Sequence, residues 1–206
     1  MRDGQNSGRS MIEMLGVLAI IGILTLASFV GYKKALTKSR VNDTVRATAM
    51  VLQNYANLIL KNTRGLNING ADAVEKAVST GLNSECRIVD SDAEEYKVCD
   101  VPLGEMYIKL TDVDNEKYNF MLFVTMVDED AQTCIQFLHQ GWNEVVPKEW
   151  QPNGMIWLQS DTAEADVYKQ DAWGSVKSTD IASACNRVCK KGNEYCAVIF
   201  DFGSVY

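Results

Sequence analysis

The stretch that decides the fold is MIEMLGVLAIIGILTLASFV, residues 11–30. Glu13 is its only charged residue, and the seventeen residues from Met14 to Val30 carry no charge. As an α-helix, twenty residues rise about 30 Å, which matches the hydrocarbon thickness of a bilayer. The uncharged part is longer than the core of an ordinary signal peptide, about 7 to 15 residues, and no well-formed small-x-small cleavage site follows it. The stretch therefore predicts a membrane-spanning helix that is retained.

The apolar pattern changes after Val30 without any helix breaker. Apolar residues now recur at steps of three and four, and basic residues fall mostly between them. The apolar positions are Val41, Val45, Thr48 or Ala49, Leu52, Tyr55 or Ala56, and Ile59. No proline precedes Pro102. We therefore expect one helix over about residues 10–62, roughly 80 Å long, membrane-spanning at first and then amphipathic.

Charge is distributed unevenly along the 206 residues, whose net charge is −7. Residues 1–64 hold nine Lys or Arg against three acids, whereas residues 65–206 hold eleven basic and twenty-four acidic side chains. A chain of this length fits one globular domain plus an accessory segment. The acidic part would repel phosphates, so we expect no nucleic-acid binding. The charge pattern indicates an acidic head on a basic stem.

The head contains all six cysteines, which are Cys86, Cys99, Cys134, Cys185, Cys189 and Cys196. An even number of cysteines is typical of a domain oxidised outside the cytoplasm. A zinc site is not expected, because Cys185-x3-Cys189 has no matching second pair and His139 is the single histidine. Fifteen pairings are possible. Cys86 and Cys99 flank a short polar loop and suggest a local pair. Cys185 and Cys189 lie one helical turn apart and can reach two different partners.

Two signals disagree on membrane orientation. Four basic residues closely follow the apolar stretch and two precede it, so the positive-inside rule alone would put the head in the cytoplasm. The cysteines place the head outside the cytoplasm. We give the cysteines more weight, and expect a single span with the head outside the cytoplasm.

The head is expected to be α+β, with one antiparallel sheet and a few short helices. Periodicity and turn residues predict these elements: a helix over 71–80, a hairpin of strands 106–110 and 118–127, a helix over 130–140, strands over 155–158 and 197–202, and a helix over 179–192.

Motifs for catalysis are missing from the sequence. There is no G-x-S-x-G, H-E-x-x-H, P-loop or dinucleotide fingerprint, and a single histidine limits acid–base chemistry. Asp112, Asp114 and Glu116 alternate like a calcium loop, but the sixth position lacks glycine and the twelfth is Phe123. An exposed turn is the better interpretation. We expect no catalytic residue, no cofactor and no metal, and hence no enzyme.

Residues 8–15, GRSMIEML, resemble the processing site of type IV prepilins and of the related pseudopilins of type II secretion. The shared pattern is a short polar leader ending in glycine, then four residues, then glutamate at the head of an apolar helix. The resemblance implies that a prepilin peptidase cuts between Gly8 and Arg9 and that Arg9 becomes the N-methylated first residue. The chain would then consist of leader 1–8, helix 9–62 and head 63–206. This sequence departs from the family at Arg9, where a hydrophobic residue is usual, and at Val30, where many relatives have proline.

A carboxylate in the membrane costs about 2.5 to 3.5 kcal/mol at the helix centre and less near an interface, so Glu13 is expected to have a partner or a function. The resemblance implies that it acts in assembly. One partner is Arg9 of the same chain, four residues earlier on the same helix face. The resemblance implies another partner, the new terminal amine of an adjacent subunit.

The order of elements in the head resembles the type IVb branch of pilins. That resemblance implies a disulfide between Cys134 and Cys185, which leaves Cys189 to pair with Cys196. The function it implies is a structural subunit of a type IV pilus-like filament. The expected partners are identical or homologous subunits, the peptidase and an inner-membrane assembly machinery. The resemblance implies that the chain is made as an inner-membrane precursor and ends in an extracellular or periplasmic filament. The alternatives are a pseudopilin of a type II secretion system and a monomeric membrane-anchored binding protein.

Overall fold

A long helix begins the structure. The computed structural model describes residues 7–62, 86–91, 94–114, 117–127 and 130–204. Helix α1 runs from Ser7 to Asn62 without interruption, as the apolar and amphipathic patterns predict. The chain forms two compact units, Met1–Ser39 and Arg40–Tyr206, so the boundary between them lies within α1. The second half of the helix therefore belongs to the same unit as the head.

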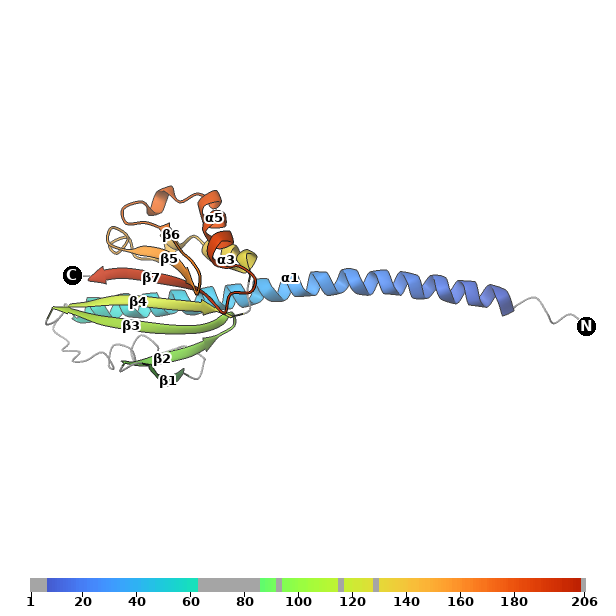
Figure 1. Ribbon diagram of the computed structural model, residues 1–206, viewed down its shortest axis with the longest axis horizontal. Coiled ribbons are helices and arrows are strands. Elements are labelled where there is room, and N and C mark those ends of the chain that lie inside the picture. Colours follow the sequence, from blue (N-terminus) through green and yellow to red (C-terminus); the bar gives the residue numbers. More distant parts are fainter. Residues whose placement is uncertain (1–6, 63–85, 92–93, 115–116, 128–129, 205–206) are drawn as a thin grey trace, which may run out of the picture. The chain divides into compact units, whose positions relative to one another are not determined.

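The head is built on one antiparallel sheet of seven strands in the order β1-β2-β3-β4-β7-β5-β6 (Figure 1). β7 pairs with both β4 and β5, so it joins the four consecutively paired strands β1 to β4 to the β5–β6 hairpin. The strands are β1 (Cys86–Ser91), β2 (Glu94–Val101), β3 (Gly104–Asp114), β4 (Lys117–Met126), β5 (Met155–Ser160), β6 (Glu164–Tyr168) and β7 (Cys196–Ser204). The helices that follow α1 are α3 (Ala131–Leu138), α4 (Trp142–Val145), the 3-10 turn η1 (Trp173–Ser175) and α5 (Ser178–Val188).

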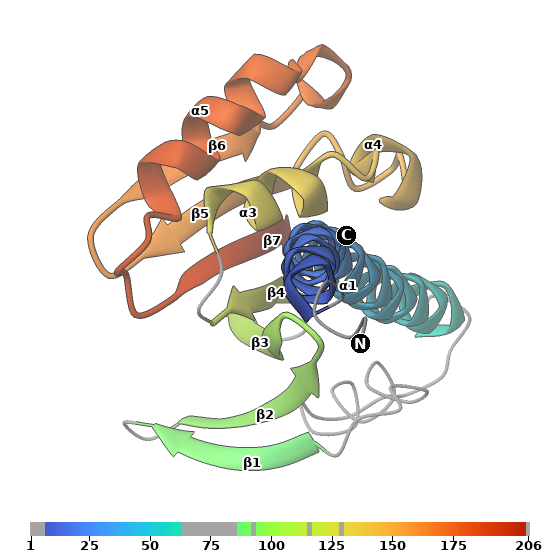
Figure 2. The same cartoon turned by 90° about the vertical axis from the view of Figure 1, so that its right-hand side faces the viewer.

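One face of this sheet carries the core. In the described part of β4, alternate residues Phe120, Leu122, Val124 and Met126 are buried, as period-two patterning requires. The Tyr55 ring of α1 stacks on Phe120, with 3.8 Å between centroids. From the same face, Phe200 contacts the aromatic rings of Phe137 and Trp142. Helices α1, α3 and α4 therefore share one side of the sheet, as Figure 2 shows in a view along α1.

The amphipathic stripe of α1 is the part of the helix that faces this core. Its buried positions are Val41, Thr44, Thr48, Val51, Leu52 and Tyr55. The predicted positions 41, 48, 52 and 55 are among them, whereas Val45 is half-buried. The Ile59 side chain is not among those that the structure describes.

Several elements differ from the sequence prediction. The polar stretch between Cys86 and Cys99, expected to be a loop, forms the paired strands β1 and β2. β6 and α4 were not predicted, and α5 ends at Val188 with Cys189 as its C-cap, not at Gly192. The helix over 130–140 is shorter, with Asp130 as N-cap and His139 as C-cap. The helix expected over 71–80 lies outside the described residues.

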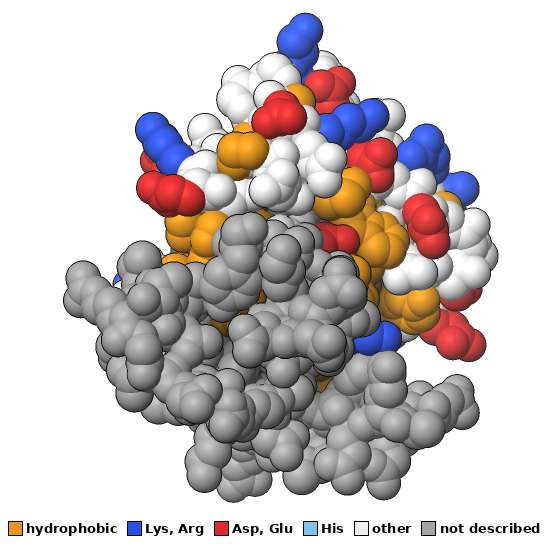
Figure 3. All heavy atoms as spheres, turned by 90° about the vertical axis from the view of Figure 1, so that its left-hand side faces the viewer, with side chains coloured by type: hydrophobic (Ala, Val, Ile, Leu, Met, Phe, Trp, Pro, Cys, Tyr) orange, Lys and Arg blue, Asp and Glu red, His pale blue; other side chains and the backbone are white. Residues whose placement is uncertain are grey.

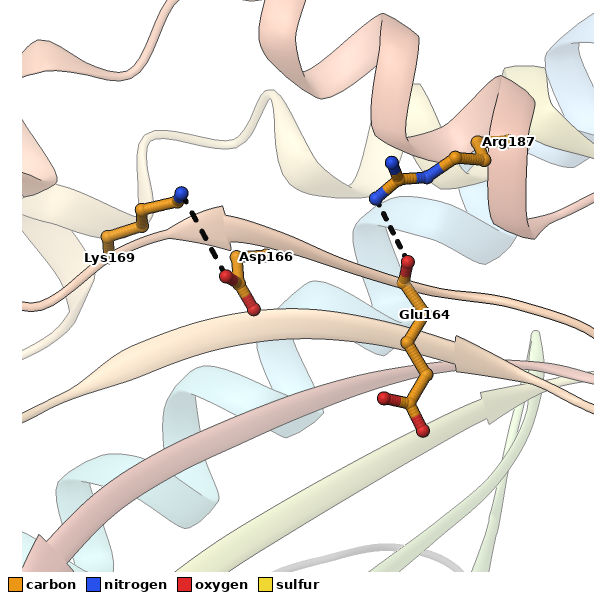
Figure 4. A network of polar contacts seen from close by, with 4 residues as sticks. All are labelled: Glu164, Asp166, Lys169 and Arg187. Atoms are coloured by element: carbon orange, nitrogen blue, oxygen red, sulfur yellow. Dashed lines mark hydrogen bonds and ion pairs between the residues drawn. The ribbon is translucent and has the colours of Figure 1, made fainter.

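The edge strand β6 pairs with β5 and also makes polar contacts outside the sheet. Arg187 of α5 donates from Nη2 to the backbone carbonyl of Glu164 at 2.9 Å, and Lys169 lies 3.9 Å from the Asp166 carboxylate (Figure 4). Charged side chains at a sheet edge disfavour pairing with a strand from another chain. The Arg187 hydrogen bond thus links the edge strand to α5.

Candidate assembly segment and the head that carries it

The first part of α1 exposes apolar side chains on all sides. Every residue from Met11 to Leu26 is exposed, and the exposed fraction of the side chains reaches 74% at Ile12 and is still 50% at Ile21. A helix in a water-soluble protein normally buries one apolar stripe. A helix that is apolar all round needs lipid or other protein chains around it. By length and composition, α1 can cross a membrane.

The polar side chains inside the apolar segment satisfy their donors within the helix. Thr25 Oγ1 donates to the carbonyl of Gly22 at 2.9 Å, and Ser28 Oγ donates to the carbonyl of Leu24 at 2.7 Å. A hydroxyl without a partner would cost several kcal/mol in hydrocarbon. These hydroxyls therefore do not prevent the segment from entering a bilayer or an apolar bundle. Sequence periodicity did not single them out.

The apolar segment ends in a shallow groove and a cation–π contact. The groove on the helix surface is lined by Ile21, Leu24, Thr25, Ser28, Phe29 and Tyr32. Lys33 Nζ lies 5.0 Å from the centroid of the Phe29 ring. A lysine at the end of an apolar helix can lay its aliphatic stem along the segment and keep its ammonium in the interface. Lys33 is the first charged residue after Glu13, so the uncharged part of α1 ends before it.

The residues that the sequence predicts to act in processing and assembly lie on one continuous helix. Gly8 and Arg9 are in the first turn of the described part of α1, and Glu13 follows one turn after Arg9. The Glu13 side chain is exposed. The side chains of residues 7–10 are not among those described, so the expected pairing of Glu13 with Arg9 stays a prediction. An exposed carboxylate two residues into an apolar segment is available to a cationic partner.

A polar joint connects α1 to the turn between β2 and β3. Arg40 Nε donates to the carbonyl of Pro102 at 2.7 Å, and the backbone N–H of Leu103 donates to Thr44 Oγ1 at 3.2 Å. Thr44 and Leu103 are fully buried. A buried N–H that finds its acceptor on a distant helix fixes that helix against the sheet. The sequence offered little sign of this joint, since Thr44 only interrupts an apolar stripe.

The head contains the two disulfide pairs that the resemblance to type IVb pilins implied. Cys134 of α3 is bonded to Cys185 of α5, and Cys189 is bonded to Cys196 at the start of β7. Cys99 also belongs to a disulfide. In the register of β1 and β2, Cys86 lies directly opposite Cys99. The strand pairing thus agrees with the expected local bridge.

Other polar and aromatic residues that could have served in binding or catalysis lie at helix ends, at a strand end or in the core. The side chain of Asp130 caps α3 by accepting from the backbone N–H groups of Gln132 and Thr133 at 3.0 and 3.1 Å. His139 is exposed at the other end of this helix. Asp112 and Asp114 lie at the end of β3, while Glu116 lies outside the described residues. Trp142, Trp150 and Trp173 are buried and Trp157 is half-buried.

The acidic excess of the head is dispersed on the face drawn in Figure 3. Among the described residues of that face, acidic and basic side chains are interspersed. No single-sign patch is visible in this part of the surface. Interspersed charges favour solubility and do not create a strong field for a polyanion.

Comparisons with known proteins give few matches. No family model matches the chain, and no curated protein does so. Among solved structures, the chain is similar to the crystal structure of a type IVb pilin from Salmonella typhi, with a TM-score of 0.41 and 11% sequence identity. The similarity covers 76% of this chain and 97% of that one.

Proposed function

We propose that this chain is a structural subunit of a type IV pilus-like filament, polymerised through the first part of α1. The observation that carries the proposal is the segment from Met11 to Val30, whose described side chains are exposed and apolar on every side, with Glu13 as its only charge. The same segment can lie in a bilayer in the precursor and in a bundle of identical helices in the filament. Lipid is as apolar as such a bundle, so packing and polar pairing must decide between them.

Maturation removes residues 1–8 in this proposal. A prepilin peptidase cuts after Gly8, and the new amino group of Arg9 is methylated. The sequence pattern around the cut and the position of Glu13 support this step. Glu13 then attracts the terminal amine of a neighbouring subunit, which neutralises a charge that would otherwise oppose burial among apolar helices.

The head stays outside the cytoplasm and forms the surface of the filament. The described disulfides support an oxidising compartment. A pseudopilin of a type II secretion system would share these features. A filament found on the cell surface, rather than in the periplasm, separates a pilus from a pseudopilus.

The test of this function is the N-terminus of the protein extracted from membranes. Mass spectrometry should find a chain that begins at Arg9, with the mass of a methylated terminus. Gly8→Ala should slow the cut, because a peptidase approaches the backbone closely at glycine. Gly4→Ala in the same leader is the matched control and should leave the cut unchanged.

An intact Met1 in the mature protein would contradict processing and would favour the membrane-anchored binding protein. A chain that begins after Ala27 would instead indicate a conventional signal peptide. In either case the head would still be closed by its disulfides.

A further inference from the structure

The two disulfides between α3, α5 and β7 form one buried sulfur cluster. The Sγ atoms of Cys134, Cys189 and Cys196 all lie within 4.8 Å of one another. Cys134 and Cys185 are fully buried, and Cys189 and Cys196 are 2% and 3% exposed. One sulfur of the first bridge therefore lies beside both sulfurs of the second bridge.

We propose that Cys134, Cys189 and Cys196 form an intramolecular thiol–disulfide exchange site. When Cys134 is not bonded to Cys185, its thiolate attacks Sγ of Cys189. The Cys134–Cys189 bond forms, the Cys189–Cys196 bond breaks, and the electron pair leaves on Cys196, which takes up a proton. Attack on Cys196 gives the mirror result, with Cys189 as the free thiol. One thiol and one disulfide are present before and after, so the step needs no oxidant or reductant.

The packing of the site favours exchange within the head over exchange with outside thiols. Groups held in contact react as if at very high concentration. Burial raises the pKa of a thiol, which makes the reactive thiolate scarce, and it also excludes external reagents. Exchange is therefore slow in absolute terms and directed to the neighbouring sulfurs.

This site lets the head rearrange disulfides that have formed between the wrong cysteines. Cys134 is made before Cys185, Cys189 and Cys196 along the chain, so it can pair first with any of them. In a mispaired Cys134–Cys189 bond, the Cys196 thiolate can attack Cys189, which forms the native Cys189–Cys196 bond and releases Cys134 as a thiol. In a mispaired Cys134–Cys196 bond, Cys189 attacks Cys196 with the same result. The cluster thus couples formation of the disulfide between α3 and α5 to formation of the disulfide that spans the loop before β7.

The test uses the full chain with Cys185→Ser, which frees the Cys134 thiol. The variant is purified at acid pH, where thiolates are absent, and then held at neutral to mildly alkaline pH for increasing times. After acid quenching, the thiols are alkylated in denaturant and the peptides are mapped without reduction. The alkyl label should spread from Cys134 to Cys196 or Cys189 with time, and Cys134 should be recovered in a disulfide.

A label that stays on Cys134 alone, with Cys189–Cys196 intact, would overturn the proposal. If this variant does not accumulate, Cys189→Ser gives the same test from the other side. The free Cys196 should then attack Cys134 and release Cys185, so a label confined to Cys196 would be the contrary result. Cys86→Ser is the control, since Cys99 lies in β2, outside the cluster, and its thiol should keep all of the label.

Discussion

At the scale of single residues, Gly104 shows how closely β3 and β4 approach each other at the first residue of β3. Its φ is +154°, and a Cβ there would overlap the carbonyl oxygen of Thr125 and lie 3.1 Å from the backbone nitrogen of Val127. Backbone atoms of a paired strand cannot yield cheaply, and the φ is strained for any L side chain. We expect Gly104→Ala to lower the free energy of unfolding by about 2 kcal/mol or more in urea denaturation.

Gly174→Ala is the matched control for this substitution. Nothing lies within 4 Å of a Cβ at Gly174, and its φ is not positive. Its effect should stay within about 0.5 kcal/mol. Equal losses from both variants would show that the approach of Thr125 does not constrain Gly104.

Tyr168 gives the head a dependence on alkaline pH. The residue is 5% exposed, and its hydroxyl donates to the carbonyl of Leu138 at 3.3 Å. Desolvation by burial raises the pKa of its phenol above the ordinary value of 10.0. The unfolded chain therefore loses this proton at lower pH than the folded chain does. The stability that Tyr168 contributes is present below pH 10 and is lost as the pH rises through the higher folded value.

Tyr168→Phe should remove this dependence. Near neutral pH the variant should be less stable by about 0.5 to 1.5 kcal/mol, because a buried hydrogen bond is lost. The difference from the parent protein should shrink or change sign above about pH 10. Urea midpoints across the alkaline range measure it. A difference that is constant with pH would mean that ionisation of Tyr168 is not linked to folding.

At the scale of elements, the joint between α1 and the β2–β3 turn rests on Thr44. Thr44→Val keeps the shape but leaves the buried N–H of Leu103 without an acceptor. We expect a loss of about 1 to 3 kcal/mol in the free energy of unfolding. Thr48→Val is the matched control, because Thr48 is equally buried and its hydroxyl donates only to the carbonyl of Thr44 at 2.8 Å. Thr48→Val should lower the free energy of unfolding by less than Thr44→Val does. A larger loss from Thr48→Val would show that this joint does not hold α1.

The sequence predicted the elements whose signal is local and long. α1 carries an uninterrupted apolar run and then a 3.6-residue stripe, so its end at Asn62 was predictable. β1 and β2 were missed because Asp90, Glu94 and Glu95 disfavour strands, and only pairing with β3 makes this hairpin part of a sheet. β6 did carry a usable signal, since Glu164 and Asp166 are exposed and Ala165 and Val167 are buried.

Only the part of the candidate site that is contiguous in the sequence was predictable. The spacing of Gly8, Arg9 and Glu13 is visible in the sequence, whereas the contact between two disulfides is not. Cysteines far apart in the chain meet only after α3, α5 and β7 have packed together. For the same physical reason, the acceptor role of Thr44 depends on Leu103, which lies 59 residues away in the sequence.

At the scale of the whole molecule, the two compact units make opposite demands on their surroundings. The head buries its aromatic residues and closes itself with disulfides. The described side chains of the segment from Met11 to Val30 are all exposed. The free energy that holds the head together is therefore internal, whereas the apolar segment must obtain its stabilisation from lipid or from other chains.

Glu13 decides which of these surroundings the apolar segment prefers in the proposed function. Glu13→Gln keeps the size and the hydrogen-bonding groups but removes the charge, which also lowers the cost of the membrane-inserted form. Processing at Gly8 and membrane insertion should survive, and both are measured by mass spectrometry of the membrane fraction. Filaments sheared from the cell surface should become scarce, because the neighbour's terminal amine loses its counter-charge.

The reading of this variant depends on Arg9. If Glu13 pairs only with Arg9 of its own chain, the loss of filaments should be mild, and adding Arg9→Phe should restore them by removing the charge that Glu13→Gln leaves unpaired. If Glu13 recruits a neighbour, Arg9→Phe should not restore assembly. Glu149→Gln, the same change at an exposed position of the head, should leave filaments intact. Normal filaments from Glu13→Gln would refute the contact between subunits, and a parent chain without filaments would point to the membrane-anchored binding protein.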